Sequence, residues 1–304
     1  MTTMAIIGGG TMGTDIAAVF AGAGCATHVA ETDPGRRAAL PGRLGRERLG
    51  DSAPLPVVHA TLEAIPWATI DVAIECVPET LPFKRSVFAA MERQARPDAL
   101  LTSNSSSFPI SAIAEGLATA QRMFGLHFFM PAHLVPLVEV VCSAASDPTL
   151  AQALVQLMRD NGKVPVLVRR DLPGFLANRM QHAMAREAFA LIDAGIATPE
   201  DVDAAVRFGF GFRFLAAGPA LQRDHAGLDI HCAAAATMYP TLAANTEPAR
   251  VLREHVARGE LGMKTGHGFY AWTPETIAAE RARYEALLRA ALELVRADLP
   301  KGNE

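Results

Sequence analysis

The sequence predicts an α/β protein in two parts, a doubly wound parallel sheet followed by an all-helical part. Short apolar segments alternate with helical patterns as far as residue 141, and the first of these segments runs into a glycine-rich turn. Beyond residue 171 almost only helical patterns remain. Strands that alternate with helices are typical of a parallel sheet. We therefore expect domains at residues 1–171 and 172–304.

The composition is that of a folded protein without a strong charge. Of 304 residues, 50% are hydrophobic and 20% are charged, and the formal net charge is -4. This balance gives no reason to expect nucleic acid or an anionic membrane as a partner. The start of the chain lacks a signal-peptide pattern, and no stretch approaches the roughly 20 apolar residues of a membrane-spanning helix. The four cysteines are scattered singly, which favours reduced thiols, a cytoplasmic location and no metal site.

The glycine-rich turn after residues 4–7 reads Gly8-Gly9-Gly10-Thr11-Met12-Gly13, and a small-residue helix over residues 15–23 follows it. In the pattern G-x-G-x-x-G the first glycine permits a tight turn, the second lets a pyrophosphate approach the backbone, and the third lets the helix pack on the strand. An ordinary strand-turn-helix is the alternative. The context favours a dinucleotide site of the Rossmann type.

A second strand, residues 26–30, ends at Glu31. A carboxylate at this distance from the turn can accept hydrogen bonds from both ribose hydroxyls of the adenosine and would repel a 2′-phosphate, which favours NAD over NADP. Arg36 and Arg37 keep NADP as an alternative, because they could neutralise such a phosphate.

Residues 33–66 are rich in loops and arginine, with at most one short helix between residues 36 and 49. A strand over 70–77, a helix over 83–94 and a strand over 99–101 follow, and the last strand leads into a run of hydroxyl side chains at 102–107. Ligands bind at such strand ends in an open sheet. The serines are equally good N-caps for a helix at 111–116.

Residues 125–141 carry the strongest catalytic candidates. His127 follows one apolar run, Glu139 lies inside a second, and a proline-containing turn joins the two. Two strands joined in this way would bring His127 and Glu139 together. A buried glutamate needs a partner, and a carboxylate that orients an imidazole makes a general base. The alternative is a surface histidine and a strand-edge glutamate without contact.

The rest of the chain reads as a helix over 149–161, a strand over 165–168 and then helices. We expect a long amphipathic helix over 175–194, a helix that begins with Thr198 as N-cap and Pro199 at its first position, and a flexible aromatic link at 209–214. Another helix toward Met238, a glycine-rich turn at 261–270 and a closing helix over 273–298 complete the prediction.

Several of these motifs together resemble the L-3-hydroxyacyl-CoA dehydrogenase family. They are GGGTMG, the strand-end Glu31, ECVPE, TSNSSS, GLHFF followed by PLVEVV, DLPGFLANR, GP with a later DHAGLD, and KTGHGFY. The resemblance covers nearly the whole chain. It implies an N-terminal Rossmann domain that binds NAD and a helical C-terminal domain through which subunits form a homodimer.

The resemblance also implies roles for individual residues. The catalytic histidine of the family matches His127 and its partner glutamate matches Glu139, while Ser106 and Asn178 match the groups that hold the substrate oxygen. The predicted cofactor-binding residues are Gly8, Gly10, Thr11, Met12, Gly13, Glu31, Val77, Pro78, Glu79, Lys84 and Asn104.

Four departures from the family pattern bear on the substrate. Met130 stands where the family has an active-site asparagine, residues 33–66 are shorter than the lysine-rich hairpin that grips CoA, and Pro136 replaces a lysine. The segment GFGFRFLAAGP, which contains Arg213, is similar to the branch that acts on free hydroxy acids such as L-gulonate or carnitine. Arg213 can bind a carboxylate in bidentate fashion, or it can be a structural arginine. We thus place Met130 and Arg213 at the substrate.

These features predict an NAD-dependent dehydrogenase of a 3-hydroxy acid or a 3-hydroxyacyl-CoA, with a slight preference for a small substrate. A short-chain 3-hydroxyacyl-CoA such as 3-hydroxybutyryl-CoA is the close alternative. From another class, a catalytically silent crystallin-like protein remains, which the loss of the asparagine at Met130 favours. An NAD sensor is a further alternative, and only the Rossmann half of the chain supports it.

Overall fold

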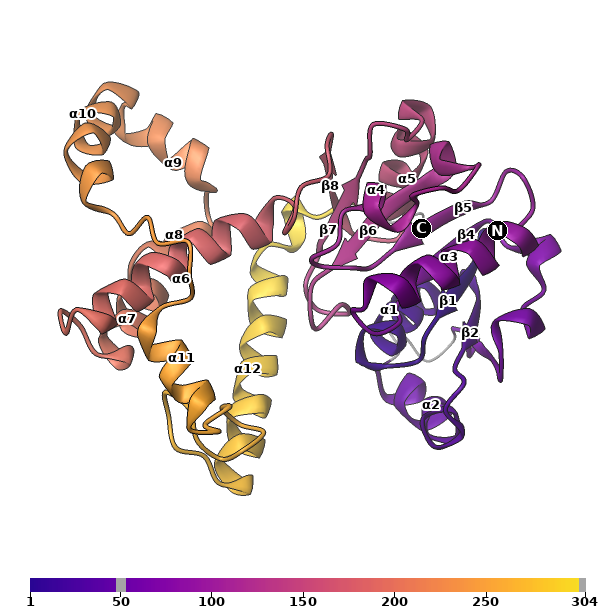
Figure 1. Ribbon diagram of the computed structural model, residues 1–304, viewed down its shortest axis with the longest axis horizontal. Coiled ribbons are helices and arrows are strands. Elements are labelled where there is room, and N and C mark those ends of the chain that lie inside the picture. Colours follow the sequence, from indigo (N-terminus) through magenta and orange to yellow (C-terminus); the bar gives the residue numbers. More distant parts are fainter. Residues whose placement is uncertain (48–52, 301–304) are drawn as a thin grey trace. The chain divides into compact units, whose positions relative to one another are not determined.

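The structure, a computed structural model, describes residues 1–47 and 53–300, which form two compact units (Figure 1). The first unit is Met1–Arg179 with the end of the chain from Arg296, and the second is Met180–Val295. Within the described ranges, no helix is both long and apolar enough to cross a membrane.

The first unit is built on an eight-stranded sheet with the strand order β3-β2-β1-β4-β5-β6-β7-β8. The strands are β1 (Thr3–Ile7), β2 (Ala26–Ala30), β3 (Val57–His59), β4 (Val72–Glu75), β5 (Leu100–Ser103), β6 (Met123–Phe128), β7 (Leu137–Val141) and β8 (Val164–Val168). All neighbouring strands pair in parallel except β6 and β7, which are antiparallel. The predicted doubly wound sheet is confirmed, with β3 as an additional edge strand that the sequence analysis did not contain.

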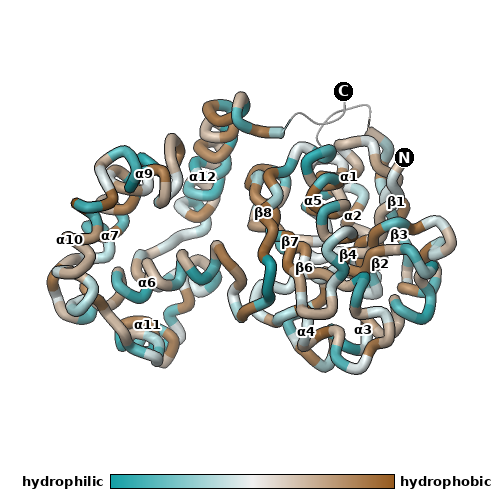
Figure 2. Tube along the Cα trace, turned by 90° about the horizontal axis from the view of Figure 1, so that it is seen from above, coloured by the Kyte–Doolittle hydropathy of each residue, from teal (hydrophilic) through white to brown (hydrophobic). Residues whose placement is uncertain are grey.

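Apolar side chains form a separate core on each face of this sheet, and Figure 2 shows hydrophobic stretches along the strands. One core includes residues of α1 (Thr11–Gly22), α2 (Pro34–Glu47) and α5 (Pro148–Asp160). The other includes residues of α3 (Leu81–Gln94) and the short helix α4 (Ile110–Ile113). The unit therefore has three layers, and both faces of the central strands are covered, as a parallel sheet requires.

Two helices of this unit differ from the prediction. α2 has 14 residues and is not the short helix expected in this region; positions 48 and 49 of the predicted stretch lie outside the described residues. α4 has only four residues and ends at Ile113. Its N-cap is Pro109, without a side-chain hydrogen bond, so the serines before it do not cap it. The amide of Ser111, the second residue of this helix, donates to the carboxylate of Asp171 instead.

The second unit is helical, as predicted. Its elements are α6 (Ala177–Asp193, which begins in the first unit), α7 (Pro199–Ala205), a π-helical turn (Val206–Phe210), α8 (Gly211–Phe214), α9 (Pro219–Ala226), α10 (Leu228–Met238), α11 (Arg250–Ala257) and α12 (Pro274–Leu294). The predicted cap of α7 is confirmed, because Thr198 and Asp201 form a reciprocal capping box. Gly227 divides the single helix that was expected toward Met238 into α9 and α10.

The prediction of a flexible aromatic link at residues 209–214 is wrong, because this stretch is helical. Only Gly209 departs from helical angles, with φ -98° and ψ -110°. A Cβ on Gly211 would lie 2.5 Å from the carbonyl oxygen of Val206. Gly211 therefore allows the backbone to pack closely against Val206 within the helix, and it does not mark a loop.

Candidate active site

The glycine turn at the end of β1 has the geometry that the sequence predicts. Gly8 has φ +110°, a conformation that favours glycine. A Cβ on Gly13 would lie 1.8 Å from the carbonyl oxygen of Gly8, so only glycine lets α1 pack this closely. A Cβ on Gly10 would meet no atom within 4 Å. The space beside Gly10 is therefore open to a ligand, at the N-terminus of α1 where a pyrophosphate is favoured.

A pocket of about 860 Å³ extends from this turn along the carboxyl ends of the strands. Its lining includes seven of the predicted cofactor residues, namely Gly8, Gly10, Thr11, Met12, Glu31, Val77 and Pro78. The ends of β1 and β4 and the start of α1 thus enclose a space with the size and backbone donors that a dinucleotide needs.

Glu31 is 4% exposed at the end of β2 and is held by several donors. Its Oε2 accepts a hydrogen bond from the Gly9 amide at 3.0 Å, and Arg36 contacts both carboxylate oxygens. Burial by itself raises the pKa of Glu31, but the hydrogen bonds from Arg36 and from the amides of Asp33 and Gly9 lower it below its usual value. Glu31 is therefore a carboxylate, and the guanidinium of Arg36 is already paired with it, which suits a ribose diol better than a phosphate.

His127 and Glu139 lie opposite each other in the antiparallel register of β6 and β7. Nδ1 of His127 is 2.8 Å from Oε2 of Glu139, and both side chains are buried. The alternative of two side chains without contact is therefore excluded. When Nδ1 carries a proton toward the carboxylate, Nε2 has the free lone pair of a general base.

The other oxygen of Glu139 is fixed by the start of α6. Oε1 accepts hydrogen bonds from the amides of Leu176 at 3.0 Å and Ala177 at 2.8 Å. Burial alone raises the pKa of Glu139, but the hydrogen bonds from His127, Ala177 and Leu176 together lower it below its usual value. The carboxylate is thus held ionised in one orientation, which fixes the imidazole in turn.

Aromatic rings enclose the imidazole of His127. The ring centroid of Phe129 lies 4.5 Å from that of His127, and the centroid of Phe175 lies 5.6 Å away, both edge-on. Phe175 has φ +48°, which few non-glycine residues adopt, and follows Gly174 with φ +76°. The strained turn in the motif DLPGF therefore places one ring on the histidine and the next two amides on Glu139.

Glu79 holds the run of serines after β5 in place by hydrogen bonds. Its Oε1 accepts hydrogen bonds from the hydroxyls of Ser105 and Ser107, both at 2.6 Å, and from the amides of Ser106 and Ser107. Its Oε2 pairs with Lys84 at 3.0 Å. Burial raises the pKa of Glu79, but the hydrogen bonds from Ser105, Ser107 and Lys84 prevail and lower it to about 2.

A pocket of about 390 Å³ is lined by three of the four predicted catalytic residues, and the fourth, Glu139, contacts it through His127. Its lining includes Ser106, His127, Met130 and Asn178, and also Glu79, Lys84 and Asn104. Asn104 accepts a hydrogen bond from the Phe128 amide, which leaves its NH₂ group for another acceptor. The residues Met12, Cys76 and Val77 also line the larger pocket, so the two pockets adjoin.

Met130 occupies this pocket as an exposed apolar side chain. It is 65% exposed and follows Phe129, so the wall at this position is hydrophobic where the family has an amide. Arg213 belongs to the second unit and lies in a pocket formed by that unit alone. Among the described residues, no three His, Cys, Asp or Glu side chains lie close enough together to hold a metal ion.

The sequence analysis did not identify Glu75, which is fully buried in β4. Its Oε1 accepts hydrogen bonds from Lys84 at 2.9 Å and from the Val77 amide, and its Oε2 accepts one from Ser103. The signal was present, because Glu75 stands inside the apolar run DVAIECV and a buried carboxylate needs partners. Lys84, which is 1% exposed, pairs with both Glu75 and Glu79, and Lys84 and Glu79 line the smaller pocket.

Comparison with known proteins agrees with this geometry. The NAD-binding domain family of 3-hydroxyacyl-CoA dehydrogenase matches residues 3–172, and the C-terminal domain family of the same enzyme matches residues 174–272. The chain belongs to the 3-hydroxyacyl-CoA dehydrogenase family. It is accordingly an NAD-dependent oxidoreductase.

Relatives of this dehydrogenase family differ in substrate. The 5-formyl-3-hydroxy-2-methylpyridine 4-carboxylate 5-dehydrogenase of Mesorhizobium japonicum is 31% identical over 95% of this chain and 98% of its own. A solved structure of a dehydrogenase of that activity, described as an NAD⁺-dependent dismutase, has a TM-score of 0.91 at 28% identity and covers 97% of this chain and 99% of its own. The (S)-3-hydroxybutyryl-CoA dehydrogenase of Ralstonia eutropha has a TM-score of 0.71 at 28% identity, with 90% of this chain and 99% of its own covered.

Proposed function

We propose that this dehydrogenase oxidises or reduces a small free acid that carries a hydroxyl or carbonyl group, with His127 as general base. The observation that carries the proposal is the buried pair of His127 and Glu139 at 2.8 Å beside a pocket suited to NAD. The proposed cofactor residues are those predicted from the sequence, with Lys84 acting through Glu79. Bound NAD supplies the acceptor for the hydride.

In the oxidation, Nε2 of His127 takes the proton of the substrate hydroxyl as the adjacent C–H bond loses its hydride and a carbonyl forms. Glu139 holds the imidazole in one tautomer and stabilises the imidazolium. Ser106 and Asn178 line the same pocket and would hold the reacting oxygen by hydrogen bonds. Ser106 is suited to this role because its hydroxyl has no hydrogen-bond partner within residues 1–47 and 53–300.

Three observations support a small free acid. The relative that acts on a pyridine carboxylate covers nearly the full length of both chains, and the structure of that activity superposes with a higher TM-score than the hydroxybutyryl-CoA enzyme. Met130 makes one wall of the reaction pocket apolar. Arg213 offers a guanidinium for a carboxylate, and its role as a substrate residue is part of this proposal.

A short-chain 3-hydroxyacyl-CoA is the second candidate, because relatives named 3-hydroxybutyryl-CoA dehydrogenase share the family and the fold. That substrate would also place the protein in fatty acid metabolism. A catalytically silent protein is a weaker candidate, since His127, Ser106 and Asn178 line one pocket and Glu139 pairs with His127.

The test is NADH formation, followed by absorbance, with NAD and a panel of substrates. The panel pairs L-3-hydroxybutyryl-CoA with free 3-hydroxybutyrate, L-gulonate, carnitine and a pyridine carboxylate that bears a hydroxymethyl or formyl group. We expect turnover of a free acid. Turnover of the CoA ester alone would contradict the small-acid proposal. If no substrate of the panel is turned over although the protein binds NADH, the catalytically silent protein is favoured.

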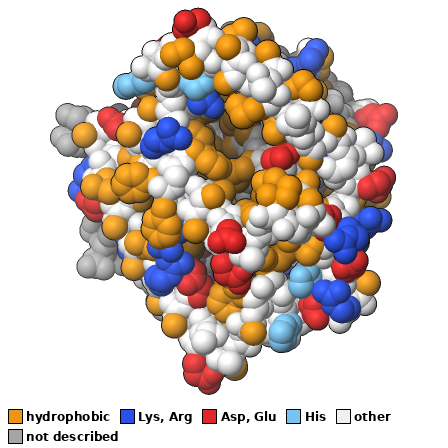
Figure 3. All heavy atoms as spheres, turned by 90° about the vertical axis from the view of Figure 1, so that its left-hand side faces the viewer, with side chains coloured by type: hydrophobic (Ala, Val, Ile, Leu, Met, Phe, Trp, Pro, Cys, Tyr) orange, Lys and Arg blue, Asp and Glu red, His pale blue; other side chains and the backbone are white. Residues whose placement is uncertain are grey.

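We also propose that the protein is a cytoplasmic homodimer, with residues 1–171 serving the cofactor and 172–304 serving the substrate and the dimer contact. In the second unit no described residue is buried, and large apolar side chains are at its surface (Figure 3). Phe208, Tyr239 and Leu294 are 70%, 71% and 77% exposed. A helical unit that leaves so much apolar surface in water is stabilised when a second copy covers it.

A further inference from the structure

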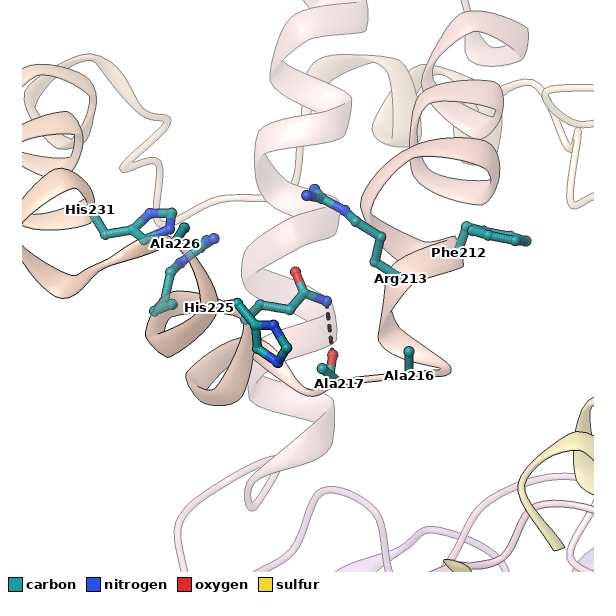
Figure 4. Close-up of a pocket in the computed structure, with 9 residues that line it drawn as sticks. Phe212, Arg213, Ala216, Ala217, His225, Ala226 and His231 are labelled. Carbon is teal, nitrogen blue, oxygen red and sulfur yellow. Dashed lines mark hydrogen bonds between the residues drawn. The ribbon is translucent and has the colours of Figure 1, made fainter. Parts of the chain in front are cut away.

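The helical unit contains a pocket of its own, of about 460 Å³, formed by α8, α9, α10 and the turn between α8 and α9. Its lining consists of Phe212, Arg213, Ala216, Ala217, Gln222, Arg223, His225, Ala226 and His231. Figure 4 shows Arg213 extending from α8 toward the side on which His225 and His231 lie, whereas Phe212 points to the opposite side. Arginine and histidine side chains from three helices therefore line one pocket.

This lining is cationic and has no counter-charge. It contains two arginines and two histidines but no aspartate or glutamate. Within residues 1–47 and 53–300, neither Arg213 nor Arg223 makes a side-chain hydrogen bond or an ion pair, whereas four other arginines of the same unit each pair with a glutamate: Arg250, Arg258, Arg283 and Arg289. Two unpaired guanidinium groups at one hollow attract an anion.

The rest of the lining consists of apolar residues and one glutamine. Ala216, Ala217 and Ala226 offer small hydrophobic surfaces. The side chain of Gln222 is fixed, because its NH₂ group donates to the carbonyl oxygen of Ala217 at 2.8 Å, as the dashed line in Figure 4 shows. This bond ties the start of α9 to the turn before it. The volume suits a small organic molecule, for which such pockets commonly span about 300–1,000 Å³.

We infer that this pocket binds a small organic carboxylate, with Arg213 and Arg223 on the carboxylate, His225 and His231 as further donors, and the alanines against its apolar body. The carboxylate belongs either to the substrate or to a separate small acid. Only the first source rests on the proposed function; the site itself does not.

Benzoate and its uncharged analogue benzamide are matched probes, and titration calorimetry on the full-length protein with NADH present measures their binding without turnover. We expect benzoate to bind to the wild type and benzamide to bind at least tenfold more weakly. Arg213→Gln and, separately, Arg223→Gln should each weaken benzoate binding about tenfold or more, since a charge-assisted pair to a carboxylate is lost. Arg253→Gln is the control, because Arg253 is an exposed arginine of α11 outside the pocket.

Equal affinity for benzoate and benzamide, or equal benzoate binding by all three variants with unchanged melting temperatures, would overturn the inference. So would the absence of benzoate binding to the wild type. As spectroscopic evidence of location, the imidazole NMR signals of His225 and His231 should move with benzoate in the wild type and stay in place in Arg213→Gln.

Inhibition kinetics separate the two sources of the carboxylate. If benzoate competes with the acid substrate, the pocket binds the carboxylate of the substrate. If benzoate inhibits without competition, the pocket binds a separate acid. Both outcomes support a carboxylate site at this pocket. If no substrate of the panel is turned over while benzoate still binds through Arg213, the proposed function is wrong and the carboxylate site is supported. If a substrate of the panel is turned over but neither arginine substitution changes benzoate binding, the carboxylate site is wrong and the proposed function is unaffected.

Discussion

At the scale of single residues, the chemistry depends on Glu139 as much as on His127. Glu139 is fully buried, and its carboxylate is held by one imidazole and two backbone amides. A glutamine in its place keeps the shape and one acceptor. However, it loses the charge that stabilises the imidazolium and can present an NH₂ group to the histidine.

For Glu139→Gln we expect kcat to fall about 10²–10⁴-fold, since loss of the carboxylate that orients a catalytic histidine has effects of this order. The Kd for NADH should stay within about twofold, because Glu139 does not line the cofactor pocket. Steady-state kinetics and NADH fluorescence titration measure the two quantities. A variant with a kcat within threefold of the wild type would show that the pair is structural.

Glu79 gives a prediction about stability and pH. Its pKa of about 2 lies below the ordinary value of about 4.3 expected in the unfolded chain. The stabilisation from ionised Glu79 is therefore present above about pH 4 and is lost as the pH falls toward 2. We expect the melting temperature of the wild type to fall more steeply than that of Glu79→Gln across this range, in calorimetric scans. Glu285→Gln, at an exposed position on α12, should keep the wild-type slope; equal slopes for all three proteins would contradict the role of Glu79.

At the scale of elements, two glycines at the start of α1 are expected to have different roles, Gly10 in cofactor binding and Gly13 in the packing of the fold. Gly10→Ala introduces a methyl group into open space, at φ -67° and ψ -167°, which alanine adopts readily. Gly13→Ala instead places its methyl against the Gly8 carbonyl, so α1 must move away from the strand.

We therefore expect Gly10→Ala to melt like the wild type but to bind NADH at least about tenfold more weakly, because a ligand phosphate needs that space. Gly13→Ala should lose both NADH affinity and thermal stability. As a control, Gly42→Ala within α2 meets no neighbour and should stabilise the fold by up to about 1 kcal/mol while it leaves NADH binding unchanged. Unchanged NADH binding by Gly10→Ala would contradict the assignment of the phosphate site.

Local patterns predicted most elements, and the misses have physical causes. The glycine turn, the pairing of His127 with Glu139 and the capping box at Thr198 depend on neighbours in the sequence or on one strand pair. α11 was missed because its N-cap is an alanine; its first amides are capped by Asp193, more than fifty residues away. The network around Glu75 was likewise missed, since its side-chain partners Lys84 and Ser103 come from α3 and β5.

At the scale of the whole molecule, the two units contrast in how they bury their apolar residues. The first has two extensive cores on its sheet, and the second has no buried residue among those described. Such a contrast cannot be read from the sequence, because the apolar periodicity of a helix is the same whether its partner is another helix of the chain or a second copy.

We expect light scattering coupled to size exclusion to give twice the chain mass of 32.3 kDa. Because dimerisation contributes to stability by mass action, the melting temperature should rise with protein concentration. A monodisperse species of 32.3 kDa with a concentration-independent melting temperature would contradict the homodimer.

The central claim is that this chain catalyses NAD-dependent oxidation of a free acid through His127. Its most direct test is NADH formation with the substrate panel, measured side by side for the wild type and His127→Ala. We predict turnover of a free acid by the wild type, a loss of about 10³-fold or more in kcat for the variant, and NADH affinity within about twofold in both. Equal turnover by the two proteins would contradict the account.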